Sequence, residues 1–258
     1  MRYSLRALRW ASIVLWICFF LIIVTVVYSA FNIKVEVGDF QILAENENIV
    51  WAQPFVIDNA GFYDVSDLNI TTILKDTNGT ILIKGSSHID EIPKKECSTV
   101  WHNVSINLEE IPNYQIYLTN DAIFTIEQII YLNFAKILPF SVKVNSTMAW
   151  GAPLYNLSIS RPSVQHINST HSNVSLNVSF ENHSPISLEG TVRIEILNEY
   201  GEKIGVEEKS ISVLNNSPYE ETMEILVDAS KITSYITVKV SFETSLFSYE
   251  TEVQYGGY

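Results

Sequence analysis

Residues 173–180 read Asn-Val-Ser-Leu-Asn-Val-Ser-Phe, with an apolar side chain at every second position. Successive side chains of a β-strand point to opposite faces, so Val174, Leu176, Val178 and Phe180 share one face and the polar residues share the other. This alternation predicts a strand with one buried and one solvent-exposed face.

The same alternation recurs throughout the chain after residue 30. Further clear segments lie at 33–37, 68–71, 192–196 and 236–242. Many short strands with one polar face are typical of antiparallel sheets that stack as a sandwich. We therefore expect a mainly β protein built from immunoglobulin-like or fibronectin-like antiparallel β-sandwiches.

An internal repeat indicates two such sandwiches in tandem. At a constant offset of 122 residues, the matched pairs are Asp76 with Asn198, Gly79 with Gly201, Ile89 with Ile211 and Ile92 with Leu214, and Asn59 falls against Asn182 after a slip of one residue. Both copies contain a hairpin turn, where Asn, Asp and Gly tolerate positive φ. The alternative is that any two sandwich domains share this strand–turn–strand texture. We predict domains at 31–160 and 161–258, with the junction at Ser160-Arg161-Pro162.

One ectodomain helix is expected between the two copies. Ile123, Ile126, Ile130 and Phe134 recur at near-helical spacing, and residues 119–121 (Thr-Asn-Asp) offer N-cap side chains. The pattern predicts a short helix at 120–137 that packs on the first sandwich.

Residues 11–30, ASIVLWICFFLIIVTVVYSA, contain no charged side chain. A helix rises about 1.5 Å per residue, so twenty residues match the hydrocarbon core of a bilayer, about 30 Å. This run predicts a single transmembrane helix after a tail at 1–10. The alternative is a cleaved secretory signal, whose apolar region is usually shorter and whose cleavage site prefers a small residue where Tyr28 stands.

Charge predicts the orientation of this helix. The chain has 258 residues and a net charge of −13, yet residues 1–30 hold Arg2, Arg6 and Arg9 and no acid. By the positive-inside rule, the N-terminus lies in the cytoplasm and the acidic C-terminal body lies outside a cell membrane that is crossed once. Such an acidic body repels phosphate backbones, which excludes nucleic acid as a partner.

Asn-x-Ser/Thr sequons are in excess, which supports an exterior location. Chance predicts about three in a chain of this composition. The sequence holds ten candidate glycosylation sites: Asn69, Asn78, Asn103, Asn145, Asn156, Asn168, Asn173, Asn177, Asn182 and Asn215. The alternative is that Asn and Ser/Thr co-occur on polar strand faces.

Signatures of catalysis are missing from the sequence. It contains no Gly-rich phosphate loop, no GxSxG elbow and no HExxH string. His166 and His171 are close in sequence but are typical of a polar surface loop, and acidic pairs such as Asp64 with Asp67 do not form a calcium-loop pattern. We expect no enzyme, no cofactor and no metal.

The two cysteines, Cys18 and Cys97, cannot meet within one chain, because Cys18 falls in the predicted membrane span. Cys97 is therefore free, buried or joined to another molecule. A small apolar core residue is the commonest role of a lone cysteine.

Several features together resemble a known domain family. They are the strand at 55–59 that ends in Asn59, the strand at 68–74, the Asn78-Gly79 hairpin and the segment from Ile89 to Pro93. This combination is similar to the water-stress and hypersensitive-response domain, also called the group 2 late-embryogenesis-abundant domain, over about 45–160 and more faintly over 165–258. The resemblance implies a β-sandwich with a short helix, and membrane-anchored tandem copies resemble proteins common in archaea. The Asn-Pro-Asn signature of plant members is replaced here by residues 58–61 (Asp-Asn-Ala-Gly), and the family implies no catalytic residues.

These observations predict a membrane-anchored, glycosylated cell-surface structural or interaction protein, held by residues 11–30. The alternative is an accessory subunit of a membrane or envelope complex, paired with a protein partner through a sheet edge or through Cys97. A ligand-binding ectodomain is a further alternative.

Overall fold

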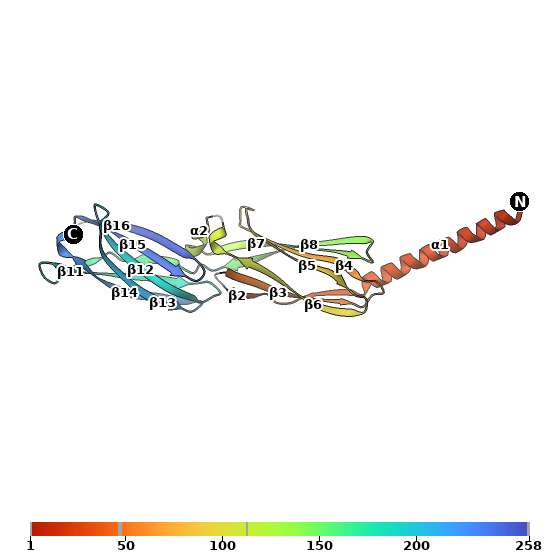
Figure 1. Ribbon diagram of the computed structural model, residues 1–258, viewed down its shortest axis with the longest axis horizontal. Helices are drawn as coiled ribbons and strands as arrows, with labels where there is room; N and C mark the ends of the chain where they lie inside the picture. Colours follow the sequence, from red (N-terminus) through yellow and green to blue (C-terminus); the bar gives the residue numbers. More distant parts are fainter. Residues whose placement is uncertain (1, 46–47, 112, 257–258) are drawn as a thin grey trace.

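The computed structural model describes residues 2–45, 48–111 and 113–256. An N-terminal helix, α1 (Arg2–Phe31), leads directly into two β-rich domains that lie end to end, with the C-terminus far from the N-terminus (Figure 1). Its segment Ala7–Phe31 is long and apolar enough to cross a membrane, by length and composition. The described chain thus has the expected order of an apolar helix followed by two sandwiches.

The first domain contains two four-stranded antiparallel sheets. One sheet is formed by β1 (Ile33–Val37), β2 (Gln41–Glu45), β3 (Asn48–Asn59) and β6 (Glu96–Ile106). The other has the order β5-β4-β7-β8, formed by β4 (Val65–Lys75), β5 (Ile81–Ile92), β7 (Ala122–Phe134) and β8 (Leu138–Trp150). A 3-10 turn, η1 (Leu108–Glu110), and a short helix, α2 (Tyr114–Thr119), connect β6 to β7.

The second domain repeats this topology strand for strand. One sheet is formed by β9 (Tyr155–Ile159), β10 (Ser163–His166), β11 (His171–Asn182) and β14 (Ser217–Asp228). The other has the order β13-β12-β15-β16, formed by β12 (Leu188–Asn198), β13 (Lys203–Val213), β15 (Tyr235–Thr244) and β16 (Ser248–Gly256). A 3-10 turn, η2 (Ala229–Lys231), takes the place of η1 and α2. The predicted mainly β fold with two tandem antiparallel sandwiches is confirmed.

The strand pairing matches in detail between the two copies. In each, two short strands share one edge of a long strand: β1 and β2 on β3, and β9 and β10 on β11. The hairpin glycines Gly79 and Gly201 have φ of +84° and +75°, in the region that favours glycine. One matched pair needs correction. The side chain of Asn59 donates to the carbonyl oxygen of Ile92, and that of Asn182 donates to the carbonyl oxygen of Val213, so Ile92 corresponds to Val213 rather than to Leu214.

The predicted helix at 120–137 is wrong. Residues 122–134 form β7, an interior strand between β4 and β8, and the helix of the first domain is the shorter α2 at 114–119. In β7 the side chains of Phe124, Ile126 and Leu132 are buried at even positions, whereas Ile123 is exposed. Apolar residues on both faces of a strand imitate helical spacing.

The domain junction lies a few residues before Ser160. Strand β9 starts at Tyr155 and pairs with β11, so it already belongs to the second domain, and the connection is residues 151–154. Here Ala152 and Leu154 are fully buried. One continuous cluster of buried apolar side chains extends from the far half of the first domain through Leu154 into the second.

Candidate functional site

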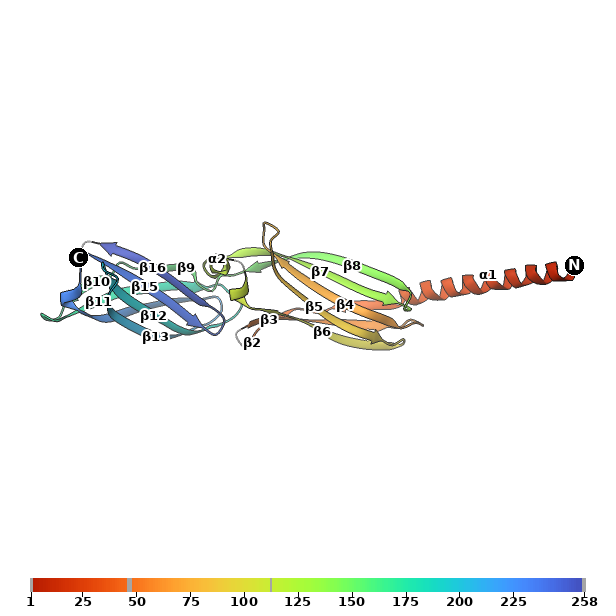
Figure 2. The same ribbon diagram turned by 45° about the horizontal axis from the view of Figure 1, so that its top comes forward.

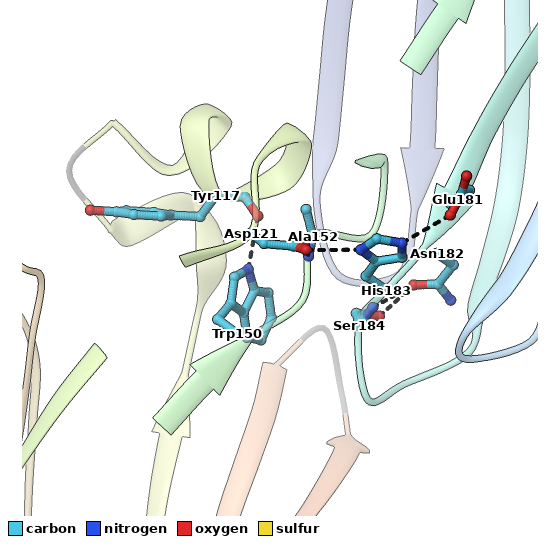
Figure 3. Close-up of polar contacts among 8 residues, drawn as sticks. All are labelled: Tyr117, Asp121, Trp150, Ala152, Glu181, Asn182, His183 and Ser184. Atoms are coloured by element: carbon cyan, nitrogen blue, oxygen red, sulfur yellow. Dashed lines mark hydrogen bonds and ion pairs between the residues drawn. The ribbon is translucent and has the colours of Figure 1, made fainter. Parts of the chain in front are cut away.

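Polar side chains from both domains meet at the junction, and His183 lies at the centre of this cluster (Figure 3). The imidazole projects from the loop after β11 toward Asp121, which directly precedes β7. Its Nδ1 lies 2.9 Å from Oδ2 of Asp121, and its Nε2 lies 3.0 Å from Oε2 of Glu181. Each ring nitrogen of one histidine therefore faces a different carboxylate.

This geometry favours the charged form of His183. A neutral imidazole has one N–H donor, so it can donate to only one carboxylate, whereas imidazolium donates to both. The hydrogen bond to Asp121, and then that to Glu181, raise the pKa of His183 above its ordinary value. The ring of Tyr155 stacks on the imidazole with centroids 4.1 Å apart.

Backbone contacts hold Asp121 and His183 in register across the junction. The amide of Ala152 donates to Oδ1 of Asp121 at 2.8 Å, and the amide of His183 donates to the carbonyl oxygen of Ala152 at 3.0 Å. Gly151 makes this approach possible, since a Cβ at that position would lie 1.9 Å from the carbonyl oxygen of His183. The close packing of the two domains therefore depends on glycine at 151.

A second set of contacts joins η1 and α2 to the second domain. The Tyr114 hydroxyl donates to the carbonyl oxygen of Ser248 at 2.9 Å, and the amide of Ser248 donates to the Glu109 carboxylate at 3.0 Å. Within the first domain, the indole N–H of Trp150 donates to the carbonyl oxygen of Tyr117 at 2.8 Å. The junction is thus fixed on two sides, by His183 and by Ser248.

A groove of about 1270 Å³ opens beside this cluster. Its lining includes Phe40, Asp76, Tyr117, Trp150, His183 and Asn216. Burial and the charge of Asp76 raise the pKa of Tyr117, which keeps its hydroxyl neutral at physiological pH. Of the ionisable side chains along this groove, His183 and Asp121 form the pair that joins the two domains, whereas Asp76 accepts hydrogen bonds from the amides of its own hairpin turn.

Metal ligation finds no support in the described part of the chain. Across residues 2–45, 48–111 and 113–256, no group of three or more His, Cys, Asp or Glu is placed to hold a metal ion. His166 and His171 each bond to a neighbouring hydroxyl, of Ser172 and Thr170 respectively, at 2.8 Å. One ring nitrogen of each of these two histidines, Nδ1, is thus engaged with a hydroxyl from its own hairpin.

His102 has an opposite character to His183. It is buried inside the first sandwich, where its ring nitrogens lie 2.8 Å from the Ser87 hydroxyl and 2.9 Å from the Thr72 hydroxyl. Burial lowers the pKa of His102, so this ring is a neutral bridge within the core.

Most of the candidate glycosylation sites are accessible. The exposed side chains are those of Asn78, Asn103, Asn145, Asn156, Asn168 and Asn215, and those of Asn69, Asn173 and Asn177 are half-buried. Asn182 is 0% exposed, and its Nδ2 donates to three carbonyl oxygens. A glycan on Nδ2 is incompatible with this packing, so the candidate at Asn182 is withdrawn.

Cys97 is exposed at the start of β6 and is a free thiol, as is Cys18 in α1. Of the alternatives for Cys97, a small apolar residue in the core is excluded by this exposure.

Sequence reasoning missed both Asp121 and His183. The sequence pattern places Asp121 only in a potential N-cap segment, and it does not single out His183. The single available signal was the match of Asn59 with Asn182, which places His183 opposite Ala60 and marks it as a difference between the two copies.

No protein-family model matches the chain, and no curated protein matches it. Among solved structures, the chain is similar to red sea bream transglutaminase, with 12% identity, 86% of this chain and 31% of that chain covered, and a TM-score of 0.31. It is also similar to a glycosyl hydrolase family 2 member from Bacteroides cellulosilyticus, with 10% identity and a TM-score of 0.35. That match covers 80% of this chain and 28% of that chain. The match to a β-glucuronidase from glycoside hydrolase family 2 has 11% identity and a TM-score of 0.33, and it covers 78% of this chain and 24% of that chain. The chain spans about a quarter to a third of the length of these structures, and a similarity this low carries no information on function.

Proposed function

We propose that the protein is a membrane-anchored, glycosylated cell-surface protein whose two β-sandwiches form a stiff, non-catalytic structural or interaction module. In this proposal α1 crosses the cell membrane over residues 11–30, residues 1–10 lie in the cytoplasm, and the body from residue 31 lies outside. The observation that carries it is the end-to-end arrangement of an apolar helix and two domains (Figure 2). Hydrogen bonds such as that between His183 and Asp121 join the two domains at their junction.

The junction supports a stiff module because it combines apolar and polar contacts. Buried Leu154 continues the core across the connection, while His183 and Ser248 bond to the first domain on two sides. Domains of one chain move relative to each other by default unless the interface is large and hydrophobic. The apolar cluster that continues across this junction, together with the hydrogen bonds on two sides, favours restrained motion of the two domains. The shared topology further supports an origin of both domains as copies of one domain, of the water-stress type that the sequence resembles.

Protease treatment of intact cells tests the topology. The full chain carries one epitope tag at each end, and permeabilised cells serve as the control in which both tags are accessible. We expect loss of the C-terminal tag and protection of the N-terminal tag. Loss of the N-terminal tag with protection of residues 31–258 would contradict the proposal.

A second candidate function is an accessory subunit of an envelope complex, favoured by the edge strand β8. It has 13 residues, and only β7 pairs with it among the described strands. Phe140, Val142 and Val144 are exposed on it, and Cys97 offers an exposed thiol elsewhere on the same domain. Long, exposed apolar edges are sites of strand addition by another chain. Purification in mild detergent that yields only monomer would exclude this candidate.

A further inference from the structure

The last two turns of α1 are built into the first domain rather than joined to it by a linker. Val26 packs against the core cluster that contains Phe55 and Ile57. The hydroxyls of Thr25 and Tyr63 lie 2.9 Å apart, which ties the helix to the loop between β3 and β4.

Ser29 makes a second tie to the same loop. It is fully buried, and its Oγ accepts a hydrogen bond from the amide of Phe62 at 2.7 Å. The ring of Tyr28 stacks on the ring of Phe62 with centroids 5.5 Å apart. Gly61 is required for this approach, because a Cβ there would lie 2.2 Å from Oγ of Ser29.

These contacts determine how far the domain extends back along the helix. Thr25 precedes the helix end at Phe31 by six residues, which is about 9 Å at the rise of an α-helix. Tyr63 reaches the level of Thr25, so part of the first domain lies alongside the final turns of the apolar helix. A bilayer that surrounds α1 would therefore meet the domain at its boundary.

The domain presents an apolar surface at this level, which we call the proximal tip (residues 28–31, 60–63 and 135–138). The turn between β7 and β8 lies at the same end of the domain as the end of α1 (Figures 1 and 2). Phe31 and Ile137 are 84% and 85% exposed, and Phe62 is 48% exposed. Exposed apolar side chains thus continue from the helix onto the domain.

Lysines flank these apolar side chains. Nζ of Lys95 lies 4.6 Å above the ring of Phe62 and bonds to the carbonyl oxygen of Ala60. Lys94 precedes it in the turn between β5 and β6, where its amide donates to the Asp64 carboxylate at 2.9 Å. Lys136 precedes Ile137 and pairs with Glu91 at 2.8 Å. Apolar side chains with aromatic rings and lysines beside them match the boundary between lipid headgroups and acyl chains.

We propose that the proximal tip docks on the outer lipid leaflet, with Phe62 and Ile137 at the boundary of headgroups and acyl chains and Lys94, Lys95 and Lys136 among the phosphates. The partner is a lipid surface, because the tip is continuous with the apolar helix and cannot move away from it without breaking the contacts of Thr25 and Ser29. The docking rests on the proposed membrane anchoring by α1. It fixes the angle at which the two domains leave the membrane.

Depth-dependent quenching tests this inference on the full chain in lipid nanodiscs. Each protein carries one environment-sensitive fluorophore. In the first, a Cys97→Ser variant, the label is attached at Cys18. In the other two, which lack both native cysteines, it is attached at Ile137→Cys or at Tyr200→Cys. The lipids carry nitroxides near the headgroup or deep in the acyl chain. Tyr200 is the matched control, since it is exposed on the hairpin at the far end of the second domain.

We expect shallow nitroxides to quench the Ile137 label at least about twofold, because an interfacial group lies about 5–10 Å into the boundary. The label at Tyr200 should be unaffected, and the label at Cys18 should be quenched by deep nitroxides. A quenched Cys18 label with an unquenched Ile137 label would overturn the docking and leave the anchoring in place. An unquenched Cys18 label would overturn both. An Ile137 label that is shielded from aqueous iodide but not quenched by lipid would indicate a second protein copy on the tip, and would also overturn the docking.

The Gly61→Ala variant gives an independent readout. A Cβ at 61 displaces Ser29 and loosens the helix from the domain, so quenching at Ile137 should fall while quenching at Cys18 stays unchanged. Gly79→Ala is the matched control, because a Cβ at position 79 has no atom within 4 Å. It should change neither the quenching at Ile137 nor the quenching at Cys18. Equal quenching at Ile137 in the Gly61→Ala and unmodified chains would contradict the role of this joint in docking.

Discussion

Asn59 and Asn182 occupy the same place in the two domains and make the same hydrogen bonds. Each side chain is fully buried at the end of a long strand, and each Nδ2 donates to three carbonyl oxygens. The acceptors are Tyr63, Ile92 and Pro93 in the first domain, and Ile186, Val213 and Leu214 in the second. Each Oδ1 also accepts the amide two residues later, of Gly61 or Ser184. The asparagine thus joins the turn after its own strand to the end of the β5 or β13 strand.

Replacing this asparagine by alanine should destabilise the domain that contains it. Asn182→Ala leaves buried carbonyl oxygens without donors, and we expect a loss of about 2–4 kcal/mol in the free energy of unfolding. Chemical denaturation of the full chain in detergent measures this loss. Asn215→Ala, at an exposed position, is the control and should change the free energy by less than about 0.5 kcal/mol. Equal effects of the two substitutions would contradict the structural role of Asn182.

The junction should weaken as pH rises. Asp121 and Glu181 raise the pKa of His183, so the stabilisation by the charged ring is complete below its unfolded pKa of about 6.5 and is lost as pH rises through the higher folded value. Thermal unfolding of the full chain, measured between about pH 5 and pH 9, should show a difference from His183→Gln that is largest at low pH. His102 acts in the opposite direction: burial lowers its pKa in the folded state, so the fold loses stability as pH falls through the unfolded pKa of this residue. Because this contribution is common to both proteins, the unmodified chain and His183→Gln are compared with each other at each pH.

The Asp90→Asn variant is a matched control for this titration. Asp90 pairs with His88 at 3.2 Å in an exposed position far from the junction. In an Asp90→Asn background, the stability difference caused by His183→Gln should vary with pH as it does in the unmodified chain. In an Asp121→Asn background, this variation with pH should be smaller. A difference that is independent of pH would show that His183 acts through packing on Tyr155 alone.

Gly151→Ala should separate the two domains. The added Cβ cannot fit 1.9 Å from the carbonyl oxygen of His183, so the connection must shift and the contacts of Asp121 with His183 and Ala152 must break. We expect faster cleavage at 151–154 in limited proteolysis and a larger spread of interdomain distances between spin labels. Gly79→Ala should destabilise its own turn by about 1 kcal/mol through its positive φ and leave the junction intact. Unchanged proteolysis of the Gly151→Ala chain would contradict this account.

Glycan occupancy should follow the accessibility of each asparagine in the fold. Glycopeptide mass spectrometry of the protein from its native cells should find modification among the exposed sites, of which Asn78, Asn103 and Asn145 lie in the first domain. Asn182 should be unmodified in folded protein. Full occupancy at Asn182 would mean that its glycan is attached before folding and that the hydrogen bonds described for Nδ2 do not form.

The alternation of apolar and polar residues was sufficient to predict the sandwiches, but not to place every element. Strands such as β11 have one solvent face, so their polar and apolar residues separate cleanly. Strand β7 lies between β4 and β8, and its outer face also carries apolar side chains, including Ile123 and Ile129, so the period of two is hidden. The enrichment of β7 in isoleucine is the sequence signal that favours a strand there.

The junction was beyond sequence reasoning for a different physical reason. His183 and Asp121 are 62 residues apart, and each looks like an ordinary loop residue in its own surroundings. Their contact exists only because one domain ends where the other begins, which is a property of tertiary packing. The close approach at Gly151 depends in the same way on where the second domain lies.

The in-line arrangement of the two sandwiches determines how far the protein extends from the end of α1. Strands β3 and β11 have 12 residues each, and a strand of this length measures about 40 Å. Two such lengths in succession place the hairpin at Tyr200 roughly 80 Å from the end of α1. With α1 in a bilayer, a molecule close to the lipid surface meets only the first domain. In the proposed orientation, the far end of the second domain is therefore available only to molecules that lie well beyond the lipid surface.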